Sequence, residues 1–261
     1  MRDASSFSAV VAMVLAAGIL AACETVPYTG RSQLQLISPE QETQMGAQAF
    51  QDIVGKAKLS NDVAASEMVT RVGKRIAVAS GHPEYQWEYR LIQDDKQVNA
   101  FALPGGKVAV YTGILPVTKD ENGLAAVLGH EIGHVVARHG GERISQQMGV
   151  NVVVETLAGL SSGNPAVVQS VSALLGAGAS VGVLLPWGRA QESEADHLGL
   201  ILMAKAGYDP HAARDLWVRM AELSKGSGKP PEFLSTHPSE ATRITQIEAW
   251  MPEAMQYYKP R

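Results

Sequence analysis

The sequence predicts an α+β protein that is mainly helical and contains a small β-sheet or hairpin. Apolar residues recur with helical periodicity near the start of the chain and through most of its second half, whereas the segment between them carries short runs of β-branched and aromatic residues. A chain of 261 residues, 46% hydrophobic and 18% charged, has enough apolar material for one sizeable core. Its formal net charge of -4, without a basic run, gives no reason to expect a nucleic-acid partner.

Residues 1–22 have the pattern of a secretory signal peptide. The apolar stretch from Ala9 to Ala22 is too short to span a bilayer comfortably and ends in small side chains. The segment LAAC at residues 20–23 resembles the bacterial lipobox, whose cysteine becomes the acylated first residue of the mature protein. We therefore expect lipidation at Cys23 and an anchor on the periplasmic face of a bacterial cell envelope. An ordinary signal peptide with an incidental cysteine is the alternative.

Cys23 is the only cysteine, which excludes an intramolecular disulfide and a cysteine-ligated metal cluster. Glu24 follows it at the position where an aspartate would indicate inner-membrane retention in enterobacterial lipoproteins, so the resemblance favours the outer membrane. Residues 23–37 include Pro27 and Gly30 and lack helical periodicity, which predicts an extended tether to the folded domain.

Two helices are expected after the tether. The sequence SPEQ at residues 38–41 is typical of a helix N-terminus with a serine cap and a proline in the first turn, and this helix should reach about Gly55. Apolar residues with a period near 3.6 predict a second helix from Ser60 or Asn61 to about Ser80.

Three strands are expected next, over residues 86–93, 98–103 and 107–113. The last two flank Pro104-Gly105-Gly106, a turn sequence that predicts a hairpin. From Asp120 onward the pattern is helical almost throughout.

The sequence has no visible internal repeat, so a single domain is expected over residues 38–251, with a C-terminal tail at 252–261. Residues 165–185 form the remaining apolar stretch. Gln169 and several glycine and serine interruptions favour a buried segment there, and a transmembrane helix is the alternative.

The segment VLGHEIGHVVARHGGER contains an H-E-x-x-H motif. Four residues along an α-helix turn the side chain by about 40° net and advance it by about 6 Å, so His130 and His134 share a face and can bind one ion. Asp120 or Asn122 is expected to cap this helix, and Gly140-Gly141 to end it. Histidines that are only packed or solvated are the alternative for the motif alone.

Residues 189–199, RAQESEADHLG, predict a second helix that carries carboxylates. Glu192 and Asp196 share a face by the same four-residue spacing. Glu192 could complete a site with two histidines, and Asp196 could accept a hydrogen bond from a ligand imidazole. Glu194 lies on a different face, where a solvated charge is expected.

The segments HEIGH and ESEAD resemble the H-E-x-x-H and E-x-x-x-D motifs of the zinc metallopeptidase family that includes HtpX and the CAAX prenyl endoprotease, metallopeptidase family forty-eight. TGRSQLQLIS, NAFALPGGKVAVYTGIL and STHPSEATRI resemble its soluble periplasmic or lipoprotein branch. The resemblance covers residues 28–250 and implies a zincin-like metallopeptidase domain with a small sheet or hairpin beside the active-site helix.

The resemblance implies one Zn²⁺ per chain, held by His130, His134 and Glu192. It implies Glu131 as the catalytic base and Asp196 as a hydrogen-bond partner of a ligand. A catalytic zinc site keeps an open position for a water whose pKa falls to about 7. A neighbouring carboxylate can take the water's proton and return it to the leaving amine.

Three further residues are candidates around this site. His237 precedes a proline, which disfavours helical geometry. The resemblance places it near the metal, where it would stabilise the oxyanion or occupy the open position in a resting state; a capping or surface histidine is the alternative. Arg243 is expected to pair with a carboxylate near the site or to form a structural salt bridge. His139 is expected to be structural, near the end of the first metal-binding helix.

Asn99, Ala100 and Phe101 are expected to form an edge strand onto which an extended substrate adds through main-chain hydrogen bonds. A hairpin that merely completes a small sheet is the alternative.

The leading hypothesis is a zinc endopeptidase, lipid-anchored in the bacterial envelope, that cleaves misfolded or unassembled envelope proteins. The second hypothesis is a chaperone-like assembly factor that binds clients in the same cleft with little proteolysis. A third is an integral-membrane protease, which requires residues 165–185 to insert.

Overall fold

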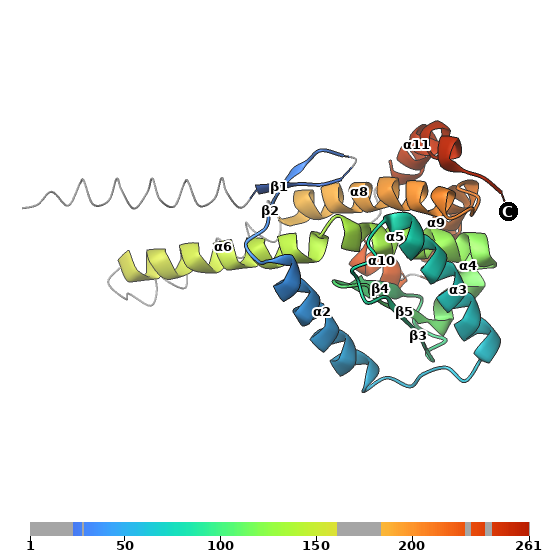
Figure 1. Cartoon of the computed structure of the whole chain (residues 1–261), viewed down its shortest axis with the longest axis horizontal. Helices are drawn as coiled ribbons and strands as arrows, with labels where there is room; N and C mark the ends of the chain where they lie inside the picture. Colours follow the sequence, from blue (N-terminus) through green and yellow to red (C-terminus); the bar gives the residue numbers. More distant parts are fainter. Residues whose placement is uncertain (1–22, 28, 161–183, 228–230, 238–241, 261) are drawn as a thin grey trace, which may run out of the picture.

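The computed structural model describes residues 23–27, 29–160, 184–227, 231–237 and 242–260. Within these ranges the fold is mainly helical with small β-sheets, which confirms the predicted α+β class (Figure 1). The helices are α2 (Pro39–Val54), α3 (Val63–Ser80), the 3-10 turn η1 (Thr112–Ile114), α4 (Leu115–Thr118), α5 (Glu121–Val136), α6 (His139–Leu160), α8 (Leu184–Lys205), α9 (His211–Ser227), α10 (Glu232–Thr236) and α11 (Arg243–Tyr257). The strands are β1 (Cys23–Thr25), β2 (Ser32–Leu34), β3 (Glu88–Ile92), β4 (Ala100–Leu103) and β5 (Lys107–Tyr111).

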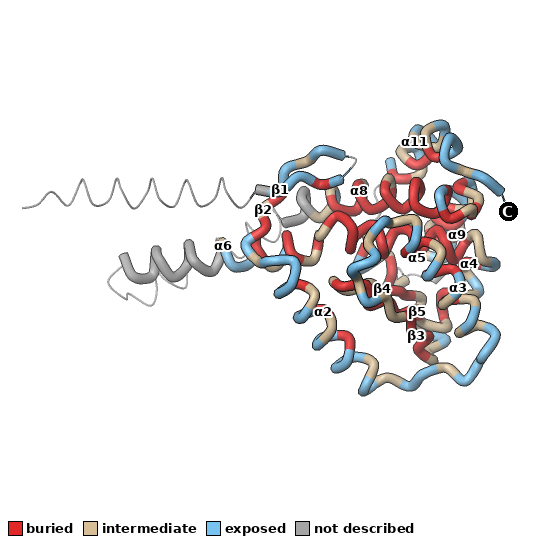
Figure 2. Tube along the Cα trace, viewed as in Figure 1, coloured by how far each residue is buried: buried red, intermediate tan, exposed pale blue. Residues whose placement is uncertain are grey.

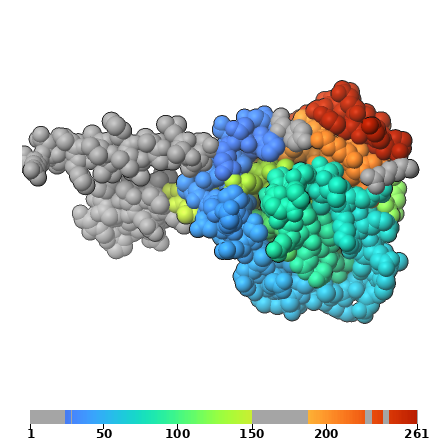
Figure 3. Space-filling view, in the orientation of Figure 1, coloured from blue at the N-terminus to red at the C-terminus, as the bar shows by residue number. Residues whose placement is uncertain are grey.

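The N-terminal segment packs against the folded domain, where the sequence predicted an extended tether. β1 and β2 pair antiparallel, and Val26 between them is buried against the end of α5. The Gln33 side chain donates to the carbonyl of Ala137 at 2.9 Å. Figure 3 shows these residues, in blue, as part of the continuous surface of the domain. Periodicity could not predict this packing, because it depends on isolated buried residues within a short ladder.

The three expected strands form one sheet in the order β3-β5-β4, with β3 and β5 parallel and β4 and β5 antiparallel. The predicted hairpin is therefore present. Its turn requires glycine, because Gly105 and Gly106 have φ of 78° and 83°. β4 lies at the edge of the sheet and contacts α5, which places an edge strand beside the helix with the H-E-x-x-H motif.

Helix α2 begins as predicted, because Ser38 and Gln41 form a capping box. Helix α3 begins at Val63, slightly later than predicted, since the Asp62 side chain accepts from the backbone N–H of Ala65 at 2.9 Å and acts as the cap.

Helices α5 and α8 form the centre of the molecule, and Figure 2 shows the buried residues concentrated along them. Their backbones are in contact through glycines. A Cβ on Gly129 would lie 2.7 Å from the carbonyl oxygen of Gly199, and a Cβ on Gly133 would lie 2.9 Å from that of Ala195. This close approach brings the acidic face of α8 against the histidine face of α5.

Helix α5 ends at Val136, and the prediction that Gly140-Gly141 terminates it was wrong, because both glycines lie inside α6. The chain turns instead at Arg138, which has φ of 55°. The Arg138 side chain pairs with Glu42 at 2.8 Å and also with Glu24, and these ion pairs hold the junction.

Helix α11 continues to Tyr257 and buries Ala254, so the C-terminal tail expected at 252–261 is largely part of the fold. Most of residues 165–185 lie outside the described residues. In the part of the chain that the structure describes, no helix is long and apolar enough to cross a membrane.

Candidate metal centre

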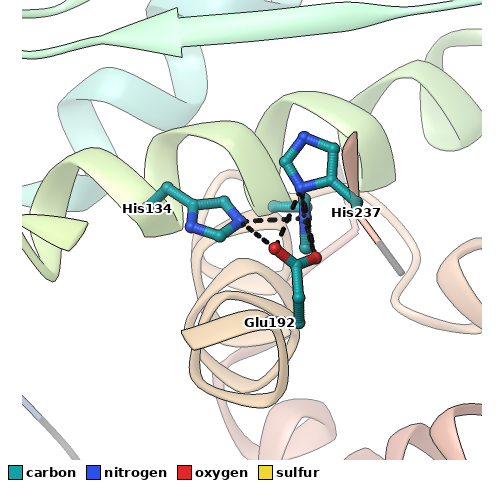
Figure 4. Close-up of side chains that lie close together, drawn as sticks. His134, Glu192 and His237 are labelled. Atoms are coloured by element: carbon teal, nitrogen blue, oxygen red, sulfur yellow. Dashed lines mark hydrogen bonds and ion pairs between the residues drawn. The ribbon is translucent and has the colours of Figure 1, made fainter. Parts of the chain in front are cut away.

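Four buried or nearly buried side chains converge between α5, α8 and the end of α10. His130, His134, Glu192 and His237 each offer one ligand atom, and these atoms lie within 4.8 Å of one another. Figure 4 shows His134, Glu192 and His237 pointing toward a common centre. The structure therefore brings together the two histidines of the motif and the distant glutamate.

The distances within this cluster are short and similar. The Nε2 atoms of His130 and His134 are 3.1 Å apart. Glu192 places one carboxylate oxygen 3.3 Å from the Nε2 of His130 and the other 3.4 Å from that of His134. The glycine contacts between α5 and α8 make this approach possible, because a larger side chain at the crossing would separate the helices.

His237 is the fourth member of the cluster. Its Nδ1 lies 3.1 Å from the Nε2 of His130 and 3.1 Å from both oxygens of Glu192, and its Nε2 lies 3.3 Å from Glu131. The ring packs on Phe233, with centroids 4.8 Å apart. This position rules out a surface histidine.

The outer nitrogen of His130 is held by a carboxylate. Its Nδ1 lies 2.9 Å from Asp196, and Arg243 donates a hydrogen bond to one oxygen of Asp196 at 2.7 Å and forms an ion pair with the other at 2.5 Å. The guanidinium of Arg243 lies 3.4 Å above the ring of Trp217. Because a carboxylate only accepts, Nδ1 of His130 donates to Asp196, which leaves Nε2 facing the cluster.

The ligand candidates are arranged as electron-pair donors. Burial lowers the pKa of His134 well below its ordinary value, so this ring is neutral. Burial raises the pKa of Glu192, but the neighbouring charge and hydrogen bonds of the imidazoles outweigh it and lower the pKa, so the carboxylate is ionised. Burial lowers the pKa of His130, but its hydrogen bonds with Asp196 and Glu192 outweigh this and raise the pKa to about 9, so this ring supplies the positive charge of the cluster at the position where a metal ion would supply it.

Glu131 is buried beside the cluster. One of its oxygens accepts from the backbone N–H of Ala102 on β4 at 3.1 Å. Burial raises the pKa of Glu131 above its ordinary value of 4.5, which makes it a stronger base than an exposed glutamate.

The edge of β4 differs in detail from the sequence-based expectation. The carbonyl of Asn99 accepts from Tyr111 on β5, so by the alternation of an antiparallel ladder Asn99 and Phe101 direct their main-chain groups toward β5. Ala100 and Ala102 direct theirs toward the outer edge, where the N–H of Ala100 donates to the side chain of Asn99 at 2.9 Å and that of Ala102 to Glu131 at 3.1 Å.

Glu194 is the clearest correction at this site. A solvated charge was expected, but its side chain is 7% exposed and accepts from Thr29 at 2.7 Å, from Arg31 at 2.9 Å and from His139 at 3.1 Å. Sequence reasoning missed this group because Arg31 and Thr29 come from the N-terminal segment, which carries no pattern that relates them to α8.

Comparison with known proteins shows the family to which the chain belongs. The model of peptidase family M48 matches residues 64–251. The chain is 41% identical over 234 residues to the mitochondrial metalloendopeptidase OMA1 of Schizosaccharomyces pombe, covering 88% of this chain and 67% of that protein. It is 36% identical over 185 residues to OMA1 of Saccharomyces cerevisiae, covering 67% of this chain and 50% of that protein.

A bacterial relative is also similar. The chain is 30% identical over 237 residues to the beta-barrel assembly-enhancing protease of Yersinia pestis, covering 87% of this chain and 47% of that protein. The chain thus spans about half the length of this relative and of the S. cerevisiae protein. With the converging histidines and glutamate, these matches show that the chain belongs to peptidase family M48.

Proposed function

We propose that this chain is a zinc-dependent endopeptidase of the bacterial cell envelope that hydrolyses misfolded or unassembled proteins. The observation that carries the peptidase function is the convergence of four donor atoms beside the buried carboxylate of Glu131. The printed names of the relatives, a metalloendopeptidase and a beta-barrel assembly-enhancing protease, support protein substrates. The envelope location and the lipid anchor at Cys23, with the outer membrane favoured, rest on the lipobox pattern at residues 20–23.

The donor set fits zinc. With bonds of about 2.0–2.2 Å, the ligand atoms of a tetrahedral zinc site lie about 3.3–3.6 Å apart. Five of the six pairs among His130, His134, Glu192 and His237 are separated by 3.1 to 3.4 Å, and all four ligand atoms lie within 4.8 Å of one another. Two or three imidazoles with one carboxylate form a ligand set that is typical of zinc enzymes.

A bound zinc would lower the pKa of a water and polarise the substrate carbonyl. The residues of this chain supply the rest of the chemistry. Glu131 takes the proton of the attacking water at its carboxylate and returns it to the leaving amine. The N–H of Ala102 holds Glu131 in place at 3.1 Å, and Asp196 holds the ring of His130.

His237 occupies the fourth position of the cluster, and we assign it a resting role. A catalytic zinc site keeps one position open, whereas a site with four protein ligands is closed. Release of His237 would open the position for water.

The substrate would add to the free edge of β4 in an extended conformation. The N–H of Ala102 holds Glu131, so the main-chain groups offered to a substrate are the carbonyls of Ala100 and Ala102 and the N–H of Ala100, which the side chain of Asn99 holds at 2.9 Å until a substrate replaces it. Recognition through main-chain hydrogen bonds selects extended, unfolded segments rather than a particular sequence, which suits a protease of misfolded proteins.

The substitution Glu131→Gln tests hydrolysis against the assembly-factor alternative. We expect casein cleavage to fall by at least about 100-fold, because the amide cannot accept a proton, while the zinc content stays at one per chain. If a cell that expresses only this variant still assembles its envelope proteins as the wild type does, the result would instead support client binding without proteolysis.

The substitution His237→Ala tests the resting role. We expect casein cleavage to become about fivefold to tenfold faster, which corresponds to about 1–1.4 kcal/mol for an imidazole that holds the position closed. Slower cleavage with the zinc content unchanged would contradict this and would assign His237 to oxyanion stabilisation.

A further inference from the structure

A second chain of hydrogen bonds begins at the other ligand histidine. The Nδ1 of His134 lies 2.8 Å from the Nδ1 of His139, and the Nε2 of His139 lies 3.1 Å from Glu194. Glu194 in turn accepts from the hydroxyl of Thr29 and from the guanidinium of Arg31. His139 and Glu194 are both buried, so this chain of hydrogen bonds connects the cluster with the N-terminal segment through the interior of the protein.

The donor and the acceptor of each hydrogen bond follow from the sequence of contacts that runs from Glu194 through His139 to His134. Glu194 has two donors, Thr29 and Arg31, and as a carboxylate it only accepts. The Nε2 of His139 must therefore carry the ring's proton, which leaves a lone pair on its Nδ1. That lone pair can only accept from His134, so the Nδ1 of His134 carries a proton and its Nε2 faces the cluster with a lone pair.

We propose that His139 and Glu194 are positioning residues of the metal centre, which fix the tautomer and ring orientation of His134, and that Thr29 and Arg31 of the N-terminal segment hold Glu194 in place. This rests on the proposed function insofar as His134 is a zinc ligand. Groups that hold the outer nitrogen of a ligand imidazole raise metal affinity by preventing the ring from turning or protonating on the wrong nitrogen. The N-terminal segment is thereby a part of the metal centre.

The test compares His139→Ala with His139→Asn in the intact protein, purified in detergent, with zinc affinity measured by competition with a chelator. We expect His139→Ala to bind zinc about 10–100-fold more weakly. The amide oxygen of His139→Asn can take the place of the lost Nδ1 acceptor, so this variant should recover most of the affinity. The visible spectrum of the Co²⁺-substituted protein should change in the alanine variant and return toward that of the wild type in the asparagine variant.

Two further variants keep the test decisive if His139→Ala does not fold. Thr29→Val and Arg31→Gln change only the end of the hydrogen-bond chain that is farthest from the cluster. We expect each to weaken zinc binding by about threefold to tenfold. Glu142→Gln is the matched control for Arg31, because it removes the charge of the second carboxylate paired with this arginine, at 2.6 Å, and leaves Glu194 untouched. His197→Ala is the control for loss of a carboxylate-paired histidine elsewhere on α8.

The outcomes separate this inference from the proposed function. If zinc affinity and the Co²⁺ spectrum are unchanged in His139→Ala while His134→Ala loses its metal, the positioning role is overturned and the metal centre stands. An equal loss in His139→Ala and His139→Asn also overturns it. If His134→Ala retains full zinc affinity, the proposed metal centre itself is wrong.

Discussion

The two ligand histidines of α5 are supported in different ways. On one side, His130 donates directly to Asp196, which is paired with Arg243, and all three side chains are buried. On the other side, His134 reaches its carboxylate, Glu194, only through a second imidazole. Both arrangements place a proton on the outer nitrogen, Nδ1, and leave the inner nitrogen, Nε2, facing the position of a metal ion.

The difference lies in where the supporting residues come from. The His130 side uses α8 and α11, with the Arg243 side chain 4% exposed. The His134 side ends at Arg31, whose side chain is 26% exposed and which lies 163 positions from Glu194 in the sequence. The first side is a closed part of the core, whereas the second can be altered by whatever displaces the N-terminal segment.

The largest effect is expected from Gly199→Ala, which acts on both sides at once. In an exposed helix this change would stabilise by about 1 kcal/mol. Here the new Cβ would lie 2.7 Å from the backbone of Gly129 and His130, so α8 must move away from α5. We expect the zinc content to fall below about a tenth per chain and the unfolding free energy to fall by about 1–3 kcal/mol.

Metal analysis and urea unfolding of the purified variant check this prediction. Gly149→Ala is the control, since a Cβ at Gly149 meets nothing within 4 Å. Full zinc content in Gly199→Ala would show that the centre does not depend on the backbone contact between the two helices.

The same contrast explains what the sequence could predict. Four-residue spacing places His130 with His134 and Glu192 with Asp196, so each half of the His130 side follows from helical geometry. The meeting of the two halves rests on the glycine contacts between α5 and α8, which the spacing of residues within either helix does not predict.

Glu194 and the helix boundary could not be predicted in this way. Glu194 has the wrong spacing for the ligand face, and its partner Arg31 lies in a segment that resembles a tether. The pair Gly140-Gly141 is a typical helix end, but the turn is made at Arg138, whose left-handed conformation is held by ion pairs with the distant Glu24 and Glu42. Long-range pairs of this kind leave no periodic pattern.

A matched pair of amide substitutions measures the difference between the two sides. Asp196→Asn should weaken zinc binding by about 10–100-fold, because the amide still accepts from His130 but leaves the buried charge of Arg243 with only the more distant carboxylate of Glu192, at 3.4 Å. Glu194→Gln should cost only about threefold to tenfold, since its effect reaches the ligand through one more ring. Chelator competition on both variants checks the order, and a larger loss in Glu194→Gln would reverse the comparison.

The smallest expected effect is the pH dependence of stability on the His134 side. Burial raises the pKa of Glu194, but the hydrogen bonds from His139, Thr29 and Arg31 outweigh it and lower the pKa below its ordinary value of 4.5. A carboxyl group with a lowered pKa in the folded state contributes stability above its unfolded pKa and loses it as the pH falls through the folded value.

Metal-free wild type should therefore exceed Glu194→Gln by about 1 kcal/mol in unfolding free energy at pH 7, and the difference should shrink steadily below about pH 4.5. Urea unfolding in the presence of a chelator measures this, and a difference that stays constant down to pH 3 would mean that Glu194 is not held as an anion by the N-terminal segment.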